Sequence, residues 1–404
     1  MRKKTLFSIY AATALLLSSC GCGGSSQQII AENFDVAEQQ TERLLRASLE
    51  TGSPRIPSTF INGEIDFVPT DDWVSGFFAG TLWYLYEYTG DHKWREGAIK
   101  HTELLDSIQY LTWHHDVGFM INCSYGNALR LTDNKAYEKV LVTTAESLST
   151  RFHEAPGTIL SWNVDRGWQG ERGWKYPVII DNMMNLELMF EASILSGNDK
   201  YSNIAIRHAD RTIKEQYRPD GSTYHVVDFD PITGDVRRRC TAQGYADESA
   251  WARGQTWSLY GYATCYRYTK DKRYLDQAMK SYDFIFNHRN LPSDLVPYWD
   301  YNAPNIPHEP RDVSSAAITA SALYEIYTYT KNEEHRKKAD KIIESLSTDA
   351  YRAKVGENGG FILMHSVGSI PHGSNIDVPL NYADYYFLEA LLRKQKIDNG
   401  ESLF

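Results

Sequence analysis

An aspartate set among apolar residues is the first candidate for chemistry. Asp181 follows the apolar run 178–180 and precedes Met183 and Met184. Removal from water disfavours a carboxylate and raises its pKa, as a general acid at neutral pH requires. Asp is also favoured just before a helix, and Asn182–Phe190 could form one. Asp181 is therefore either a candidate acid or a helix N-cap, and both interpretations stay open.

A second aspartate, Asp116, follows two histidines that could hydrogen-bond its carboxylate. Gly118 indicates a turn here, and an Asp that only stabilises its own turn is the more common case. His114 and His115 do not indicate a metal site, because adjacent residues rarely point at one ion and no third ligand is evident.

Aromatic and cationic side chains cluster in residues 241–262, which hold Gln243, Trp251, Arg253 and Trp257. Arg253 and Trp257 are four residues apart and share one face of a helix, while Trp251 joins them only if the chain enters the helix irregularly. A core face would explain the tryptophans but would leave Arg253 a costly buried charge unless it is paired. This cluster therefore favours a functional role.

The sequence lacks the motifs of other common kinds of enzyme chemistry. The sequence has no G-x-S-x-G, H-E-x-x-H, Walker or dinucleotide-binding pattern. A net charge of −10 over 404 residues argues against nucleic acid as a partner. Aromatic residues reach 13%, a surplus that suits sugar stacking and also buried helix cores.

A helical hairpin recurs along the chain and must position these residues. A helix ends in a Thr/Ser turn near Thr89, Thr132, Ser196, Thr269 and Thr330, and an amphipathic helix follows each turn. Flanking helices at Ala37–Ser48 and Asp384–Lys394 would complete about six hairpins. The repeats are long and irregular, so we predict an all-α fold, a closed (α/α)6 barrel rather than an open solenoid. The segments Gly118–Cys123 and Ser222–Phe229 are expected to form hairpin arms at the barrel mouth.

The N-terminus predicts export. Residues 1–20 combine a basic start, a short apolar stretch and Leu17-Ser18-Ser19-Cys20, which resembles a bacterial lipobox with Cys20 as the lipidated residue. Residues 21–33 are expected to form a flexible tether, and residues 34–404 a single catalytic domain. We therefore expect a periplasmic or cell-surface lipoprotein of a Gram-negative bacterium, held at the membrane by its lipid alone. Cys123, Cys240 and Cys265 show no metal or redox spacing and are expected to be core residues.

Several motifs together resemble the unsaturated glucuronyl hydrolases of glycoside hydrolase family 88. They are DWVSGFFAGTLWYLYEYTGD, HHDVGFMINCSYG, SWN, IIDNMMNLEL, AQGYADESAWARGQTWSLYGY and YADYYFLEALLR. The resemblance runs from about Phe34 to Lys394. It implies an (α/α)6 barrel that removes a 4,5-unsaturated uronic acid from the non-reducing end of glycosaminoglycan oligosaccharides made by lyases.

The resemblance also implies roles for individual residues and no metal or cofactor. Asp181 matches the general acid/base that protonates C4 of the vinyl ether before water adds at C5, and Asp116 matches a second aspartate that orients substrate and water. The other matches are substrate-binding residues: His115, His225, Gln243 and Arg253, with Trp73, Trp162, Trp251 and Trp257 as stacking walls. A vinyl ether suits such a pair, because one neutral carboxyl donates the proton and an ionised group stabilises the cation.

Two alternatives remain at this stage. The unsaturated rhamnogalacturonyl hydrolases share the fold and reaction type but act on pectin fragments. A non-catalytic glycan-binding lipoprotein could use the same tryptophans as a platform.

Overall fold

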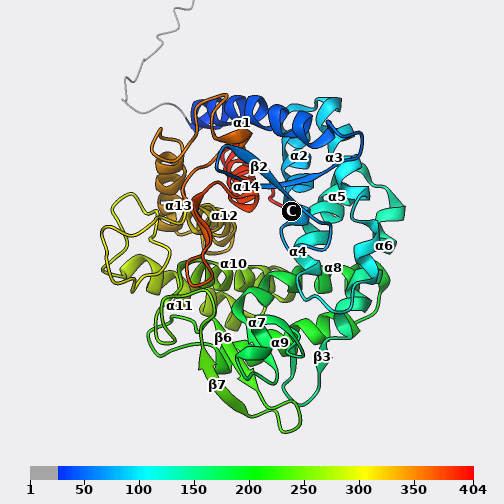
Figure 1. The fold of residues 1–404 in the computed structure, drawn as a ribbon, viewed down its shortest axis with the longest axis vertical. Helices are drawn as coiled ribbons and strands as arrows, with labels where there is room; N and C mark the ends of the chain where they lie inside the picture. The colour runs from blue at the N-terminus through cyan, green and yellow to red at the C-terminus, as the bar shows by residue number, and fades with distance from the viewer. Residues whose placement is uncertain (1–25) are drawn as a thin grey trace, which may run out of the picture.

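The computed structural model describes residues 26–404, and among them six helical segments stand side by side around a common centre (Figure 1). In order around the ring they are α2 (Ser75–Thr89), α4 (Val117–Ile121) continued by α5 (Asn127–Thr132), α8 (Leu186–Ser196), α10 (Ala252–Thr269), α12 (Val313–Thr330) and α14 (Asn381–Asp398). α14 packs against both α12 and α2, which closes the ring. α12 buries every residue from Val313 to Ile326, as expected of a helix enclosed on all sides.

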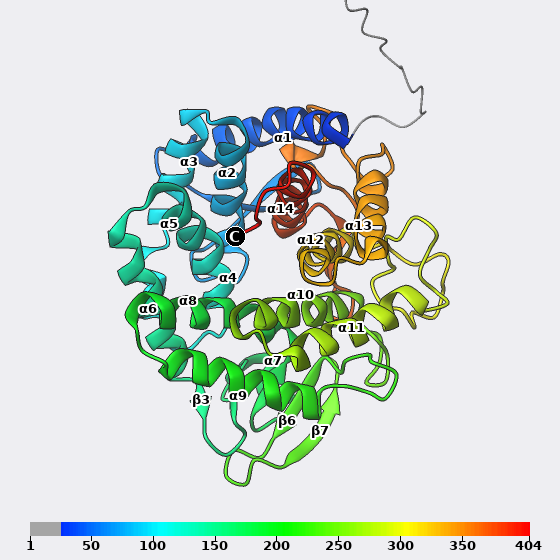
Figure 2. The same ribbon diagram turned by 180° about the vertical axis from the view of Figure 1, so that it is seen from behind.

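A second set of helices covers the outside of this ring (Figure 2). It consists of α1 (Ser26–Leu49), α3 (His92–Glu103), α6 (Lys135–Ser149), α9 (Lys200–Glu215), α11 (Lys272–Asn287) and α13 (Glu333–Leu346). These helices are amphipathic; α11, for example, buries Tyr274, Ala278, Ser281 and Ile285 on one face. Each outer helix packs on an inner one, so the predicted (α/α)6 barrel is confirmed.

The predicted turn between inner and outer helices is the same in five hairpins. The side chains of Thr89, Thr132, Ser196, Thr269 and Thr330 each donate a hydrogen bond to the carbonyl four residues earlier and accept one from the N–H two residues later. The intervening residue has positive φ, as Lys331 does at 53°. These turns reverse the chain, so the inner helices all run in one direction.

Short antiparallel strand pairs occupy the connections. They are β1 (Ile56–Ile61) with β2 (Glu64–Val68), β3 (Phe152–His153) with β4 (Thr158–Ile159), the sheet β5 (Pro177–Ile179), β6 (Val226–Phe229) and β7 (Val236–Cys240), and β8 (Ser366–Ser369) with β9 (Ser374–Val378). β2, β5 and β9 lead into α2, α8 and α14, so they lie at the end of the ring where inner helices begin. A short helix, α7 (Gly167–Glu171), lies in the loop before β5.

One predicted hairpin arm is confirmed in part and the other is wrong. Ser222–Phe229 contains β6, but Gly118–Cys123 is helical, comprising most of α4 and the start of a π turn at Asn122–Gly126. A short apolar run cannot be assigned to strand or helix from its pattern alone. In the helix Gly118 packs closely on Asn185, since a Cβ at position 118 would lie 2.5 Å from the Asn185 side chain.

The N-terminal boundary also differs from the expectation. We expected a tether up to residue 33, but α1 begins at Ser26, with Ile30 and Asn33 buried. Asn33 donates to Ser347 Oγ and accepts from Arg352, so this stretch belongs to the barrel. The signal segment 1–20, its Cys20 and residues 21–25 of the tether lie outside the described residues. No helix in residues 26–404 is long and apolar enough to span a membrane. Cys123, Cys240 and Cys265 are buried and unpaired, as predicted.

Candidate active site

The predicted site residues gather where the inner helices begin. Trp73 lies two residues before α2, and Asp116 directly precedes α4. Asp181 lies in the 3-10 turn Ile180–Asn185 that leads into α8, and Arg253 is in the first turn of α10. Because the inner helices are parallel, their N-terminal ends meet at one mouth of the ring. The partial positive charge of helix N-termini favours an anionic ligand at this mouth.

Asp181 lies in the apolar surroundings that the sequence predicts. Its side chain is 13% exposed, and it makes no N-capping hydrogen bond, so the helix-cap interpretation is wrong. Burial, together with the nearby charge of Asp116, raises its pKa to about 7, although Arg253 opposes the rise. Near neutral pH this carboxyl can therefore both give and take a proton.

Asp116 is held from three sides. Its Oδ2 lies 3.1 Å from His115 Nε2 and 3.9 Å from His114 Nδ1, and its Oδ1 accepts a hydrogen bond of 3.3 Å from Asn185. It does not cap its own turn with its side chain. Burial raises its pKa, whereas His114, Asn185 and Arg151 counteract that rise. A second carboxyl thus stands near Asp181, as the sequence predicts.

His225 joins this pair from the start of β6. Its Nε2 lies 3.6 Å from Asp181 Oδ2, and its Nδ1 accepts hydrogen bonds from the backbone N–H groups of Ala242 and Gln243, at 3.1 and 3.2 Å. Its ring contacts those of Trp251 and Trp162, with centroids 4.6 and 5.8 Å away. Gln243 also donates through its side chain to Gly368 O at 3.2 Å. The cluster 241–262 is therefore brought to the carboxyl pair.

Arg253 is buried and paired. Its guanidinium lies 3.2 Å from Asp312 Oδ2 and donates to the Gly368 carbonyl at 2.8 Å, which leaves Nε without a partner. The group also lies over the rings of Trp251 and Tyr382, at 4.6 and 5.4 Å from their centroids. Asp312 supplies the partner that a buried arginine needs. Most of the hydrogen-bonding capacity of Arg253 therefore holds the loop at β8, and its charge acts on Asp181.

The four tryptophans that we expected to be stacking walls differ in exposure. Trp251 and Trp257 are 2% and 0% exposed, so their rings form the floor beneath the site and are not open to a sugar. Trp251 enters from the irregular N-cap position of α10, as the predicted cluster requires. Trp73 and Trp162 are half-buried and remain available for stacking.

Two asparagines that the motif contained, but to which we assigned no role, complete the site. Asn182 Nδ2 donates to Ile159 O at 2.8 Å, and its Oδ1 lies 2.8 Å from His115 Nδ1. Asn185 accepts from the backbone N–H of Phe119 while it donates to Asp116. Both residues follow Asp181 in DNMMN, so their proximity to it was a usable signal. Nothing in the sequence around Asp312 indicated that it belongs to the site.

Other rings extend the aromatic surface outward from Trp162. Trp168 on α7 and the buried Trp174 lie with centroids 5.1 and 5.6 Å from that of Trp162. Arg172 lies over both rings and is exposed, and no carboxylate is paired with it among residues 26–404. This side of the mouth therefore combines stacking surfaces with an unpaired cation.

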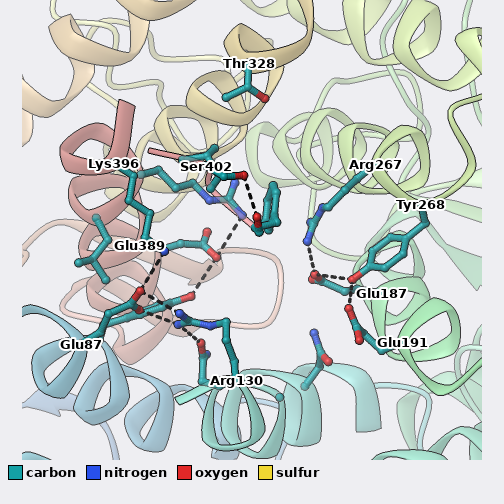
Figure 3. Close-up of a pocket in the computed structure, with 18 of the residues that line it drawn as sticks. Glu87, Arg130, Glu187, Glu191, Arg267, Tyr268, Thr328, Glu389, Lys396 and Ser402 are labelled. Carbon is teal, nitrogen blue, oxygen red and sulfur yellow. Dashed lines mark hydrogen bonds and ion pairs between the residues drawn. The ribbon is translucent and has the colours of Figure 1, made fainter. Parts of the chain in front are cut away.

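A cavity of about 870 Å³ at the opposite end of the ring is separate from this site (Figure 3). It is lined mainly by the C-terminal parts of inner helices, with Glu187 near the start of α8 and residues 401–404, and many of its charges are paired. Glu87 pairs with Arg130, Glu187 with Arg267, and Glu389 with Arg393. The cavity contains none of the predicted site residues.

The barrel and its mouth are those of an enzyme that uses carboxyl groups on a carbohydrate, since a buried acid with a raised pKa, a second aspartate and tryptophans meet there. The chain belongs to Glycosyl Hydrolase Family 88, whose model matches residues 59–386. It is thus a glycoside hydrolase.

Individual relatives agree with this family. An unsaturated glucuronyl hydrolase of Formosa agariphila is 42% identical over 372 residues, which is 92% of each chain. An unsaturated chondroitin disaccharide hydrolase of Streptococcus agalactiae is 32% identical, over 84% of this chain and 85% of the relative. The crystal structure of an unsaturated glucuronyl hydrolase specific for heparin superposes with a TM-score of 0.87 at 43% identity, covering 92% of this chain and 98% of that one.

Proposed function

We propose that this enzyme removes the 4,5-unsaturated uronic acid from the non-reducing end of glycosaminoglycan oligosaccharides produced by lyases. The observation that carries the proposal is the buried carboxyl of Asp181, whose pKa is raised to about 7, near the second carboxyl Asp116. The similarity to hydrolases of unsaturated glucuronyl and chondroitin disaccharide substrates supports it.

The reaction is a hydration of the C4=C5 double bond. Protonated Asp181 gives its proton to C4, and the positive charge that develops on C5 and the ring oxygen is stabilised by the ionised Asp116 carboxylate. Water adds at C5 and returns a proton to Asp181. The resulting hemiketal opens by breaking the bond between C5 and the ring oxygen, and rearrangement releases the remaining sugar chain.

The mouth also suits an anionic sugar. Helix N-termini converge there, and the Arg253 charge lies close enough to lower the pKa of Asp181. Trp73 and Trp162 offer partly exposed rings for the sugar faces. The uronate carboxylate and the sugar rings therefore have complementary partners.

The test uses unsaturated disaccharides made by lyases from glycosaminoglycans and from pectin, with the ultraviolet absorbance of the conjugated double bond as the signal. We expect the glycosaminoglycan products to lose absorbance and the pectin products to keep it. The reverse preference would favour the rhamnogalacturonyl activity, and binding without loss of absorbance would favour a platform without catalysis.

Asp384→Asn is a matched control for the acid. Asp384 is also buried with a pKa raised to about 7, but its two oxygens accept backbone hydrogen bonds from Ile362 and Leu363, both at 2.9 Å. This variant should still hydrate substrate, because the Asp384 carboxyl is occupied by backbone N–H groups and is not available as the acid. Equal loss of turnover in the Asp181 and Asp384 variants would point to folding instead of chemistry.

The N-terminal segment supports a location for the enzyme. Cleavage before Cys20 and lipidation of that cysteine would hold the barrel on a bacterial membrane, facing either the periplasm or the exterior. Mass spectrometry of the mature N-terminus should find lipid on Cys20, and Cys20→Ser should move the enzyme to the soluble fraction. An unmodified cysteine in the mature protein would refute the anchor.

A further inference from the structure

Two buried histidines flank the carboxyl pair, and their hydrogen bonds fix which ring nitrogen carries the proton. Nδ1 of His225 faces two backbone N–H groups, those of Ala242 and Gln243, at 3.1 and 3.2 Å. Backbone N–H groups can only donate, so this nitrogen must accept. The ring is therefore neutral, with its proton on Nε2. Adding a proton to Nδ1 would break both bonds.

The same reasoning gives His115 the opposite arrangement. The Ile159 carbonyl can only accept, so the atom of Asn182 that lies 2.8 Å from it is the amide nitrogen. Asn182 Oδ1 is thereby turned toward His115 Nδ1, at 2.8 Å. Since Oδ1 only accepts, Nδ1 of His115 carries the proton, and burial lowers the pKa of this ring to about 3, which leaves Nε2 with a free electron pair.

These two nitrogens and Asp181 Oδ2 are buried atoms without a conventional hydrogen-bond partner. His225 Nε2 lies 3.6 Å from Asp181 Oδ2, and His115 Nε2 lies 3.1 Å from Asp116 Oδ2. Catalytic hydrogen bonds are often long before substrate binds and tighten afterwards. The Asp181 side chain is 13% exposed although Oδ2 is buried, so substrate reaches the carboxyl from its other edge.

We propose that the two histidines are held as opposite neutral tautomers, and that His225 donates its Nε2–H to Asp181 Oδ2. The acidic proton of Asp181 is thereby placed on Oδ1, the oxygen that faces substrate. His115 carries its proton on Nδ1 instead, so its Nε2 can accept a hydrogen bond from Asp116 whenever that carboxyl is protonated. His225 is a positioning residue in this arrangement, and the link to catalysis rests on the proposed function.

The charges around these groups agree with the assignment. Burial and neighbouring cationic groups lower the pKa of His225 well below its usual value, which keeps the ring neutral. The titratable and charged groups near His225 are Arg253, His372, Arg172 and His115. Those near Asp181 are Asp116, Arg253, Tyr382 and His225. After the proton leaves Oδ1, the N–H of His225 stabilises the carboxylate until water returns a proton.

The direct test is nitrogen NMR of the enzyme with ¹⁵N-labelled histidine, with His225→Gln and His115→Gln used to assign the signals. We expect His225 to be protonated at Nε2 and His115 at Nδ1, without titration between about pH 5.5 and 8.5. The same tautomer in both rings, rapid exchange between tautomers, or an imidazolium signal would overturn the proposal. This measurement needs no substrate, so it distinguishes failure of the proposal from failure of the proposed activity.

The kinetic test compares His225→Gln with His225→Leu. A glutamine amide can place an N–H near the Nε2 position, whereas leucine cannot. Loss of the donor should raise the pKa of Asp181 and move the alkaline limb of the kcat profile upward by about 1 pH unit. Glutamine should restore the limb toward its wild-type position. Equal profiles for both folded variants would show that His225 does not act through Asp181.

Discussion

Replacing Asp181 by asparagine should have opposite effects on turnover and stability. Asparagine has nearly the same shape but cannot give a proton to C4, and loss of a positioned acid costs about 10²–10⁴-fold in rate. Turnover of an unsaturated disaccharide, followed by its ultraviolet absorbance, should therefore decrease by about 10²–10⁴-fold or more. Binding should persist, because the substitution leaves Arg253 and the tryptophans in place.

The gain in stability follows from the pKa. Folding raises the pKa of Asp181 from 3.8 to about 7, and this rise corresponds to about 4 kcal/mol at about 1.4 kcal/mol per unit. The folded protein keeps the proton at pH values where the unfolded chain has lost it. The protein therefore loses stability as pH rises from about 4 to 7 and loses no more from this group above that range. Asparagine does not ionise and avoids the loss.

Urea unfolding of both proteins at pH 6 and pH 8 measures this difference. The stability advantage of Asp181→Asn should be about 1 kcal/mol larger at pH 8 than at pH 6. A variant with near-normal turnover would remove Asp181 from its role as the acid. An advantage that does not change with pH would show that the carboxyl is not held protonated by burial.

Three further substitutions test the surroundings of this acid. Asp116→Asn should lower turnover and shift the alkaline limb of the kcat–pH profile to lower pH, because it removes a negative charge that raises the pKa of Asp181. An unchanged limb would contradict this coupling between the two carboxyls. Arg253→Gln should cost about 3–5 kcal/mol in urea unfolding, because Asp312 is left as an unpaired buried charge, and a cost below about 1 kcal/mol would disprove the pairing. Lys331→Gly should stabilise the enzyme by about 1 kcal/mol in the same assay, since its φ is 53°, and a loss of stability would refute backbone strain at this turn.

The features that local chemistry determines were predictable from sequence. The turn at Thr330 needs only a hydroxyl four residues after a carbonyl and two before an N–H, and such a pattern can be read within a few residues. The apolar neighbours of Asp181 likewise indicated that burial would raise its pKa. The turns and the raised pKa of Asp181 were therefore predictable from short segments, whereas the choice between an acid and a helix cap needed the structure.

Features that depend on distant packing were not predictable in the same way. Nothing near Arg253 indicates that Asp312 will pair with it, and the complete burial of Trp257 results from packing against Phe119 and Tyr386. The start of α1 at Ser26 depends on partners from the far end of the chain, such as Ser347. These are contacts between elements that the sequence separates widely.

The closure of the ring by α14 has a consequence for how the enzyme is made. α14 fills the gap between α12 and α2, and α1 packs on its outer side. Until residues 381–398 have been synthesised, the apolar faces of α2 and α12 that contact α14 remain uncovered. The ring is then incomplete, and its exposed apolar surface favours aggregation. Synthesis must therefore reach the last inner helix before the ring, and with it the active site at its mouth, can be completed.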